Sequence, residues 1–388
     1  MSHIYGIDGK GQELVRRAAA IAAETAGPAA ADVDAKGRFP KEAVSALAAG
    51  GFHGLAVPAD AGGLGRGPRD FCGVVEELAG ACPSTAMVYV MHVTAAQAIA
   101  ASARFPARAG LLKEIAAGRH LTTLAFSEKG SRSQFWMPVS SLTPAGDAFT
   151  TRAHKSWVTA AGQADTFVSS AQVPGAAKPT DSVVYLLRRQ APGVRVVAPF
   201  DGLGLRGNDS AAVDLEDAAV RPADFLSEPG AGLGMMLQTV LPWFSIGSAA
   251  MAHGICRAAV AATAAHLAGS GFEPGGARLR DLPVLRARLA EMSVRTEASR
   301  ALLGHTLGLL EAPVEATPLY VLQSRLAAVR AAIDVTDLAM KACGGAAFSR
   351  RLPLERLFRD ARAGWVMAPT ADHLEDFVGR ALTGLPLL

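Results

Sequence analysis

The sequence predicts a mainly helical α+β fold in three consecutive parts. Of its 388 residues, 50% are hydrophobic and 19% are charged, which is enough apolar material for a large packed body. Apolar residues recur at three- and four-residue spacing in both end regions, whereas the middle region favours a period of two. We therefore expect an N-terminal helical domain over residues 1–120, a small β-barrel-like domain over 121–230 and a C-terminal four-helix bundle over 231–388.

Local sequence features place the elements within these three parts. The alanine-rich N-terminal part is broken by PKEA, by the loop PADAGGLGRGP and by CPSTA, each of which carries a helix-breaking proline. In the middle, the runs LTTLAF, DTFVSSAQV, SVVYLLR and AAVDLEDAAV stand between Gly, Pro and Asp turns, which predicts strands. Helical spacing then returns in four stretches, which are residues 235–267, 283–310, 318–342 and 371–382.

The composition argues against several classes of function. The 38 basic and 35 acidic residues are spread along the chain and aromatic residues make up 6%, so we expect no nucleic-acid partner. The four cysteines form no Cys-x-x-Cys pair, which predicts no metal site and suits a reducing compartment. The N-terminus has no apolar signal segment, and no apolar run is long enough to cross a bilayer. We expect a soluble cytoplasmic protein that does not bind membranes.

One string in the middle region matches the dinucleotide-binding fingerprint. Gly202, Gly204 and Gly207 in GLGLRG fit G-x-G-x-x-G. That fingerprint requires a helix directly after the loop, whereas the residues that follow here, NDSAAVDLEDAAV, alternate as a strand does. We therefore expect no Rossmann-type site.

Six segments, in order along the chain, resemble the acyl-CoA dehydrogenase family. They are FPKEAVSALAAGGFHGLAVPADAGGLG, FSEKGSRS, HKSWVTAAGQAD, LGLRGNDSAAVDLEDAAVRP, EPGAGLGMM and CGGAAFSRRLPLERLFRDARAG. The resemblance implies a flavin-dependent oxidoreductase that acts on an acyl thioester of CoA or of a carrier protein. It implies FAD as cofactor, with FMN as the alternative, a homodimer or homotetramer, and an electron-transfer partner or flavin reductase.

The resemblance also assigns residues to the flavin. Trp157 would provide a flat apolar wall, Thr159 and Ser127 would donate hydrogen bonds to the flavin, and Ser133 would lie by a phosphate. The full set of predicted cofactor-binding residues is Leu124, Phe126, Ser127, Ser133, Trp157, Thr159, Gly344, Gly345, Thr370 and Asp372. The ordinary alternative is that Trp157 is a packed core aromatic and the two glycines a helix end.

The catalytic base of the family has no counterpart at its usual positions. Where most members carry Glu-Gly-Thr, this chain has Ala368, Pro369 and Thr370, and alanine cannot accept a proton. The other position used in the family falls on Pro242, Trp243 and Phe244, which is not acidic either. Asp372 and Glu375 are nearby candidates, although acidic residues also suit the start of a helix.

His92 is a further candidate, because flavin monooxygenases that share this fold carry a histidine on the corresponding helix. A monooxygenase needs no α-proton base, so the missing glutamate favours this alternative. A buried core histidine is the ordinary explanation of the same residue. A third possibility is a catalytically silent subunit that retains the fold for assembly.

Overall fold

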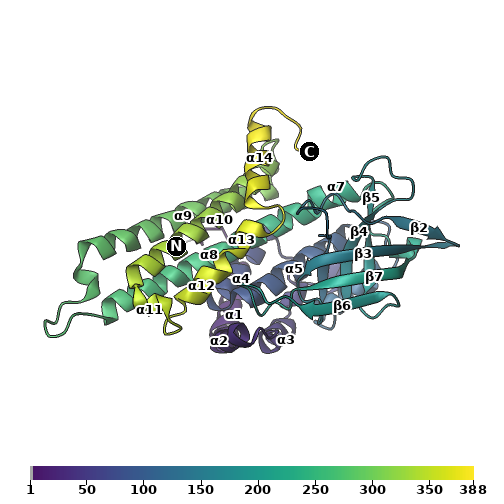
Figure 1. The fold of residues 1–388 in the computed structure, drawn as a ribbon. Helices are drawn as coiled ribbons and strands as arrows, with labels where there is room; N and C mark the ends of the chain where they lie inside the picture. Colours follow the sequence, from purple (N-terminus) through teal and green to yellow (C-terminus); the bar gives the residue numbers. More distant parts are fainter. Residues whose placement is uncertain (1–2) are drawn as a thin grey trace.

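The computed structural model describes residues 3–388 and confirms the predicted fold class, with helices at both ends and a small sheet region between them (Figure 1). The N-terminal region is helical up to residue 116, as its alanine-rich sequence predicts. Its α-helices are α1 (Gly9–Ile21), α2 (Gly27–Lys36), α3 (Lys41–Ala49), α4 (Pro68–Ala81), α5 (Pro83–Ala101) and α6 (Arg108–Ala116). Pro68 and Pro83 stand at the first turns of α4 and α5, where the missing N–H is not needed.

The middle region forms two small sheets. One has the order β1-β4-β5 and the other β2-β3-β7-β6. Their strands are β1 (Thr122–Ala125), β2 (Leu142–Ala145), β3 (Ala148–Val158), β4 (Thr166–Gln172), β5 (Ser182–Arg188), β6 (Val194–Pro199) and β7 (Ala211–Val220). Of these seven strands, only β1 and β4 pair in parallel, and the other strand pairs are antiparallel. The sheets are therefore not part of a doubly wound dinucleotide-binding fold.

Long helices make up most of the C-terminal region, at the positions that the helical periodicity predicts. They are α8 (Leu241–Gly269), α9 (Pro283–Glu311), α10 (Thr317–Cys343) and the shorter α14 (Ala371–Leu382). The short helices α7 (Gly232–Met235), α11 (Gly345–Phe348), α12 (Leu354–Ala361) and α13 (Ala363–Val366) connect and flank them. None of the helices among residues 3–388 has both the length and the apolar character that crossing a membrane requires.

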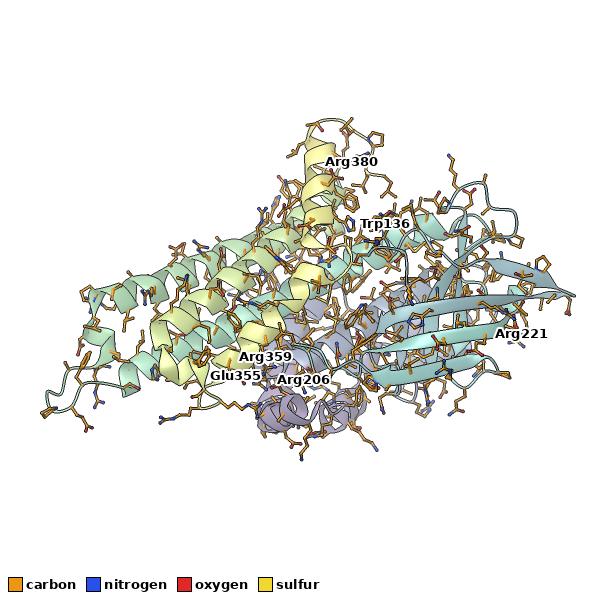
Figure 2. The ribbon with its side chains drawn as sticks, in the orientation of Figure 1. Trp136, Arg206, Arg221, Glu355, Arg359 and Arg380 are labelled. Atoms are coloured by element: carbon orange, nitrogen blue, oxygen red, sulfur yellow. The ribbon has the colours of Figure 1, made fainter. Side chains whose placement is uncertain are left out.

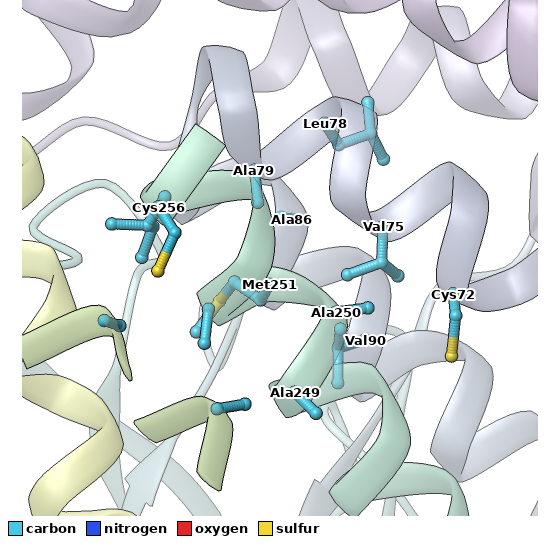
Figure 3. Close-up of a cluster of buried hydrophobic side chains, with 14 of the residues drawn as sticks. Cys72, Val75, Leu78, Ala79, Ala86, Val90, Ala249, Ala250, Met251 and Cys256 are labelled. Carbon is cyan, nitrogen blue, oxygen red and sulfur yellow. The ribbon is translucent and has the colours of Figure 1, made fainter. Parts of the chain in front are cut away.

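The two helical regions share one hydrophobic core rather than forming separate bodies. Buried side chains of α4, α5 and α8 interdigitate in it, as Figure 3 shows with Val75, Val90 and Met251 among others. Gly254 on α8 allows this close packing, because a Cβ there would lie 2.4 Å from the Glu76 carbonyl oxygen of α4. The C-terminal helices are thereby held against the N-terminal ones.

A π-helical turn interrupts the stretch predicted as one helix over 235–267. It spans Met236–Val240, and the Leu241 N–H donates to the Met236 carbonyl, five residues back instead of four. Pro242 follows directly and has no N–H to continue an α-helical pattern at that point. Such turns occur often at functional sites.

The GLGLRG segment leads into β7, an antiparallel strand between β3 and β6, as its alternating pattern predicts. Gly204 allows a close approach between two backbone segments. A Cβ on Gly204 would lie 2.4 Å from the carbonyl oxygen of Arg359, whose backbone crosses it. The Leu205 N–H, next along, donates to the buried Asp360 carboxylate at 2.6 Å. This contact joins the sheet region to α12.

We expect Gly204→Ala to destabilise the protein, because backbone cannot move aside as a flexible side chain can. Overpacking of this kind costs about 1–3 kcal/mol. The urea concentration at the midpoint of unfolding should be lower for this variant than for the wild type. Gly234→Ala is the matched control, since a Cβ there meets nothing within 4 Å. Equal midpoints for the two variants would contradict the packing role of Gly204.

Candidate functional site

A cavity of about 780 Å³ lies where the sheets meet the C-terminal helices. Each of the three regions contributes to its wall. The N-terminal region supplies Met87 and Met91 of α5, the sheet region supplies residues of β1 and β3, and the C-terminal region supplies residues of α8, α12 and α13. This volume is typical of sites that enclose a small molecule or cofactor.

The chemistry of the wall changes from one part to another. Its apolar part includes Met87, Met91, Leu124, Val240, Leu241, Phe244, Val366, Met367 and Ala368. Hydroxyl groups come from Ser127, Ser131, Ser133, Ser156, Thr159 and Ser210. Cationic side chains come from Arg132, Arg206, Arg359 and Arg362. The cavity can therefore accept a ligand with an apolar part, hydrogen-bonding edges and negative charge.

Trp157 and Phe200 form an aromatic pair in the wall. Their ring centroids lie 4.1 Å apart, and the Trp157 side chain remains exposed. Trp157 has a φ of 57°, in the left-handed region, where β3 and β7 change register between Lys155 and Val158. This irregularity of the strand aims an indole at the cavity while Thr159, two residues on, stays buried.

A buried ion pair anchors the loop that carries the serines. Lys155 on β3 is fully buried and its ammonium group binds the Glu128 carboxylate. The second oxygen of that carboxylate, Oε2, accepts the N–H groups of Val139 and Ser140 at 2.6 and 2.7 Å. Lys155 also donates to the Ser170 carbonyl at 2.7 Å. The two ends of the loop after β1 are thus joined through Glu128 and held to β3 and β4 through Lys155.

The same contacts determine the charge state of Glu128. Burial raises its pKa, but the Lys155 ammonium and the hydrogen bonds from Ser140 outweigh burial and hold the pKa below its ordinary value. Glu128 is therefore an ionised and neutralised partner at neutral pH. Within the part of the chain that the structure describes, it is also the one acidic residue in the cavity lining.

The structure brings seven of the residues singled out from the sequence into the lining of one cavity. These are Leu124, Phe126, Ser127, Ser133, Trp157, Thr159 and Ala368. Ala368 comes from the segment after α13, and the others come from β1, β3 and the loops that follow them. Six of the seven come from the predicted cofactor-binding set, and the seventh occupies the usual position of the base.

His92 lies outside the cavity lining and is completely buried in α5. Its Nδ1 accepts the Thr122 N–H at 3.2 Å, and its Nε2 pairs with the His53 carbonyl at 3.3 Å. These two partners select the tautomer that carries its proton on Nε2. Burial lowers the pKa of His92 well below its ordinary value, so the ring is neutral. In this arrangement His92 links α5 to β1 and to the His53 turn.

The three residues chosen from the start of the last helix also lie outside the lining. The Thr370 hydroxyl caps α14 by accepting the His373 N–H. Asp372 is exposed in the first turn of α14, where the helix dipole favours an acidic residue. Glu375 is exposed and forms an ion pair with Arg330 of α10 at 2.7 Å. Their immediate contacts are those of helix capping and surface pairing.

Gly344 and Gly345 lie at the C-terminal end of α10, beside α11 and far from the sheets (Figure 1). Gly344 has a φ of 54°, which ends the helix, and a Cβ on either glycine would meet nothing within 4 Å. Neither lines the cavity. Within one copy of the chain, these glycines and the seven wall residues do not form one site.

Four arginines of the cavity lining, Arg132, Arg206, Arg359 and Arg362, are outside the predicted cofactor-binding set. Arg359 on α12 reaches Asp34 at 2.6 Å and Glu355 at 2.9 Å, and Arg206 donates to the Asp34 carbonyl. Figure 2 shows Arg206, Glu355 and Arg359 together where the helices meet the sheets. Asp34 comes from α2, so contacts distant in sequence assemble this cationic edge.

We expect Glu128→Gln to destabilise the protein strongly, because it leaves the Lys155 ammonium buried without a counter-charge. Breaking a buried pair in this way costs about 3–5 kcal/mol. The double variant Glu128→Gln with Lys155→Met should recover much of the loss, since it removes both charges. Urea unfolding at neutral pH measures both, and equal losses in the two variants would contradict the pairing.

The same pair predicts a pH dependence. The folded pKa of Glu128 lies below its unfolded value, so its stabilisation is complete above the unfolded value, about 4.3. It is lost as the pH falls through the lower, folded value. Between pH 7 and pH 3, the wild type should therefore lose more unfolding free energy than Glu128→Gln does. A parallel loss in both would show that Glu128 is not the group that titrates.

Known families and proteins match the chain along most of its length. The N-terminal, middle and C-terminal domain models of acyl-CoA dehydrogenases match residues 10–119, 123–218 and 230–383. The short-chain specific acyl-CoA dehydrogenase of Bos taurus mitochondria is 28% identical over 349 residues, which are 89% of this chain and 83% of that protein. The probable acyl-CoA dehydrogenase YngJ of Bacillus subtilis is 26% identical over 363 residues, covering 91% of this chain and 93% of that one.

A similar arrangement occurs in a solved structure. Butyryl-CoA dehydrogenase from Megasphaera elsdenii superposes with a TM-score of 0.92 at 22% identity, over 97% of this chain and 99% of that one. This likeness extends to the order of helical, sheet and helical regions described above. Because the three domain models match in chain order and together cover most of the sequence, this protein belongs to the acyl-CoA dehydrogenase family.

Proposed function

We propose that the protein is an FAD-dependent oxidoreductase that oxidises an acyl thioester, of CoA or of a carrier protein, without the carboxylate base usual in its family. The observation that carries this proposal is the cavity at the junction of the three regions. It combines an aromatic wall at Trp157, hydroxyl donors at Ser127 and Thr159, and an apolar part. The membership of the family supports a flavin cofactor and an acyl-CoA substrate.

The residues present in the cavity fit a flavin. An isoalloxazine ring has flat apolar faces and a polar edge whose buried groups need hydrogen-bond partners. Trp157 offers the face, and Thr159, Ser127 and the backbone of Leu124 and Phe126 offer groups for the edge. Ser133 and Arg132 lie in the same wall and suit the phosphates that FAD and FMN both carry. FAD is proposed over FMN on the resemblance.

The reaction sets two tasks for the chain. Oxidation of an acyl thioester removes a proton from the α-carbon and a hydride from the β-carbon, and a bound flavin supplies the hydride acceptor. The apolar side chains of Met87, Met91 and Leu241 can align the acyl chain. The released proton needs an acceptor, and in this proposal it passes to water that enters the cavity. An electron-transfer protein or a flavin reductase is the proposed redox partner.

The proposed position of the missing base is Ala368. It lies in the apolar part of the cavity wall with Met367, and Phe244 of the other base position lies there too. Glu128, the acidic residue of the lining, is held by Lys155 and is not available to accept a proton. We therefore infer that saturated acyl thioesters react slowly and that substrates with a more acidic α-proton are preferred.

The same lack of a free carboxylate favours flavin-dependent monooxygenation as the second candidate function. This chemistry needs no α-proton base. His92, however, does not line the cavity, so the expected histidine is not in contact with the proposed flavin site. The two functions differ in what the reduced flavin does. Bleaching by an acyl-CoA without oxygen supports the dehydrogenase, and an oxygen adduct of the reduced flavin supports the monooxygenase. Purified protein that holds no flavin would indicate the silent subunit.

We expect Ala368→Glu combined with Pro369→Gly to accelerate anaerobic bleaching by saturated acyl-CoAs. General-base catalysis contributes about 10²- to 10⁴-fold when the reacting groups are already positioned. Pro369→Gly is included because proline restricts the backbone that would direct the new side chain. Stopped-flow absorbance with short, medium and branched acyl-CoAs provides the measurement.

Pro369→Gly alone is the matched control for the backbone change. Rapid bleaching of the wild type that disappears in Asp372→Asn or Glu375→Gln would place the base on α14 and contradict the proposal. Unchanged slow bleaching in the double variant, with flavin bound and thioester binding intact, would show that Ala368 does not face the α-carbon.

We further propose a homodimer or homotetramer formed through the C-terminal helices. Large apolar side chains are exposed there, among them Val284 and Val294 of α9, Phe272 before it and Phe348 of α11. Phe348 is 86% exposed and lies close to Gly344 and Gly345, so an assembly would cover these residues as well. Exposed apolar groups in such number are typical of an interface.

Sedimentation velocity at micromolar concentration should therefore show a dimer or tetramer. Val294→Glu should shift it towards smaller species, because burying an unpaired carboxylate is unfavourable. Leu64→Glu, on the N-terminal region, is the control for an added surface charge. A monomeric wild type with flavin bound would contradict the assembly.

A further inference from the structure

An arginine is buried directly behind the apolar wall of the cavity. Arg325, in the N-terminal half of α10, has no exposed surface, although arginine is among the residues least often buried. Its Nη2 donates to the Met367 carbonyl at 3.0 Å, and its guanidinium carbon lies 4.7 Å from the centroid of the Phe244 ring. Met367 and Phe244 both line the cavity. One layer of protein therefore separates this cation from a bound ligand.

The charge of Arg325 is not balanced by the described part of the chain. Its Nε and Nη1 are buried and have no hydrogen-bond partner among residues 3–388. Burial lowers the pKa of Arg325 to about 9, which leaves it charged at neutral pH. A buried cation without a partner is unfavourable, and a bound anion would relieve this.

Arg325 also lies between the two positions that carry the base elsewhere in the family. Its hydrogen-bond acceptor, Met367, is adjacent to Ala368, and the ring that it stacks on, Phe244, belongs to the other position. Both positions are uncharged here, so this end of the cavity is electropositive. In contrast, three of the four arginines that line the cavity are paired with carboxylates, Arg206 with Asp201, Arg359 with Asp34 and Arg362 with Asp337.

We propose that Arg325 is a specificity-determining residue and that the cavity takes an acyl thioester whose acyl chain carries a carboxylate. The acyl chain lies along the apolar wall, and rotation of the Phe244 side chain opens Nε and Nη1 of Arg325 to the carboxylate. An arginine and a carboxylate form a charge-assisted pair that a neutral chain cannot make. This inference rests on the proposed function, because it assumes that the cavity holds an acyl thioester.

Binding measurements with matched ligands test the proposal. Glutaryl-CoA carries the carboxylate, and its neutral monomethyl ester serves as the control ligand of nearly the same shape. Calorimetric titration of the flavin-loaded protein should give about 10- to 100-fold tighter binding of glutaryl-CoA, as expected for a hydrogen bond to a charged group. In Arg325→Met the ratio should fall to about one, and Arg325→Lys should retain part of the preference.

Two controls separate specificity from a structural role. Arg330→Met removes an exposed cation from the same helix and should leave the ratio of the two affinities unchanged. Thermal unfolding shows whether Arg325→Met still folds. If it does not, the ratio of the two affinities is compared between Arg325→Lys and wild type. Equal binding of the two ligands by wild type overturns the inference and leaves the proposed function standing. An equal loss of both ligands in Arg325→Met assigns it a structural role only, and binding of neither ligand by wild type overturns the proposed function itself.

Discussion

The close packing of α8 against α4 is the constraint on which the rest of the structure depends. Gly247 and Gly254 allow it, since a Cβ on either would overlap the Phe71 ring or the α4 backbone. Through this contact the N-terminal and C-terminal helices share one core (Figure 3). Because α8 is held in this way, its first turns, with Leu241 and Phe244, form a wall of the cavity opposite the sheets. Protein interiors pack densely, so this wall cannot shift independently of the core.

The sheet side of the cavity depends on a second, electrostatic constraint. Lys155 and Glu128 are both buried, and their pairing fastens the loop of serines to β3. The two buried charges of this pair compensate each other. On the helical side, by contrast, Arg325 is buried without a carboxylate. A buried charge is therefore compensated on the sheet side and uncompensated on the helical side.

The fold was predictable from the sequence because it depends mainly on local periodicity. The four C-terminal helical stretches and the four strand runs all appear at their expected positions. The alternation after GLGLRG correctly indicated the strand β7 and not a helix. The π-helical turn at Met236–Val240 could not be read from periodicity, because it depends on which carbonyl accepts the Leu241 N–H. The segments that resemble the family also predicted six residues of the cavity lining as cofactor-binding residues, from Leu124 to Thr159.

Other features of the site depend on tertiary contacts that no local pattern contains. Sequence alone determined the order of helices and strands, the family resemblance and the absence of an acidic residue at position 368. Each of these depends only on residues that are close together along the chain. Tertiary structure decided that His92 is enclosed by His53 and Thr122, that Glu375 pairs at the surface, and that Arg325 lies behind Phe244. The physical reason is that a side chain's charge and accessibility depend on partners far away in sequence, such as Asp34 for Arg359 and Met367 for Arg325. Only the packing of whole elements brings those partners together.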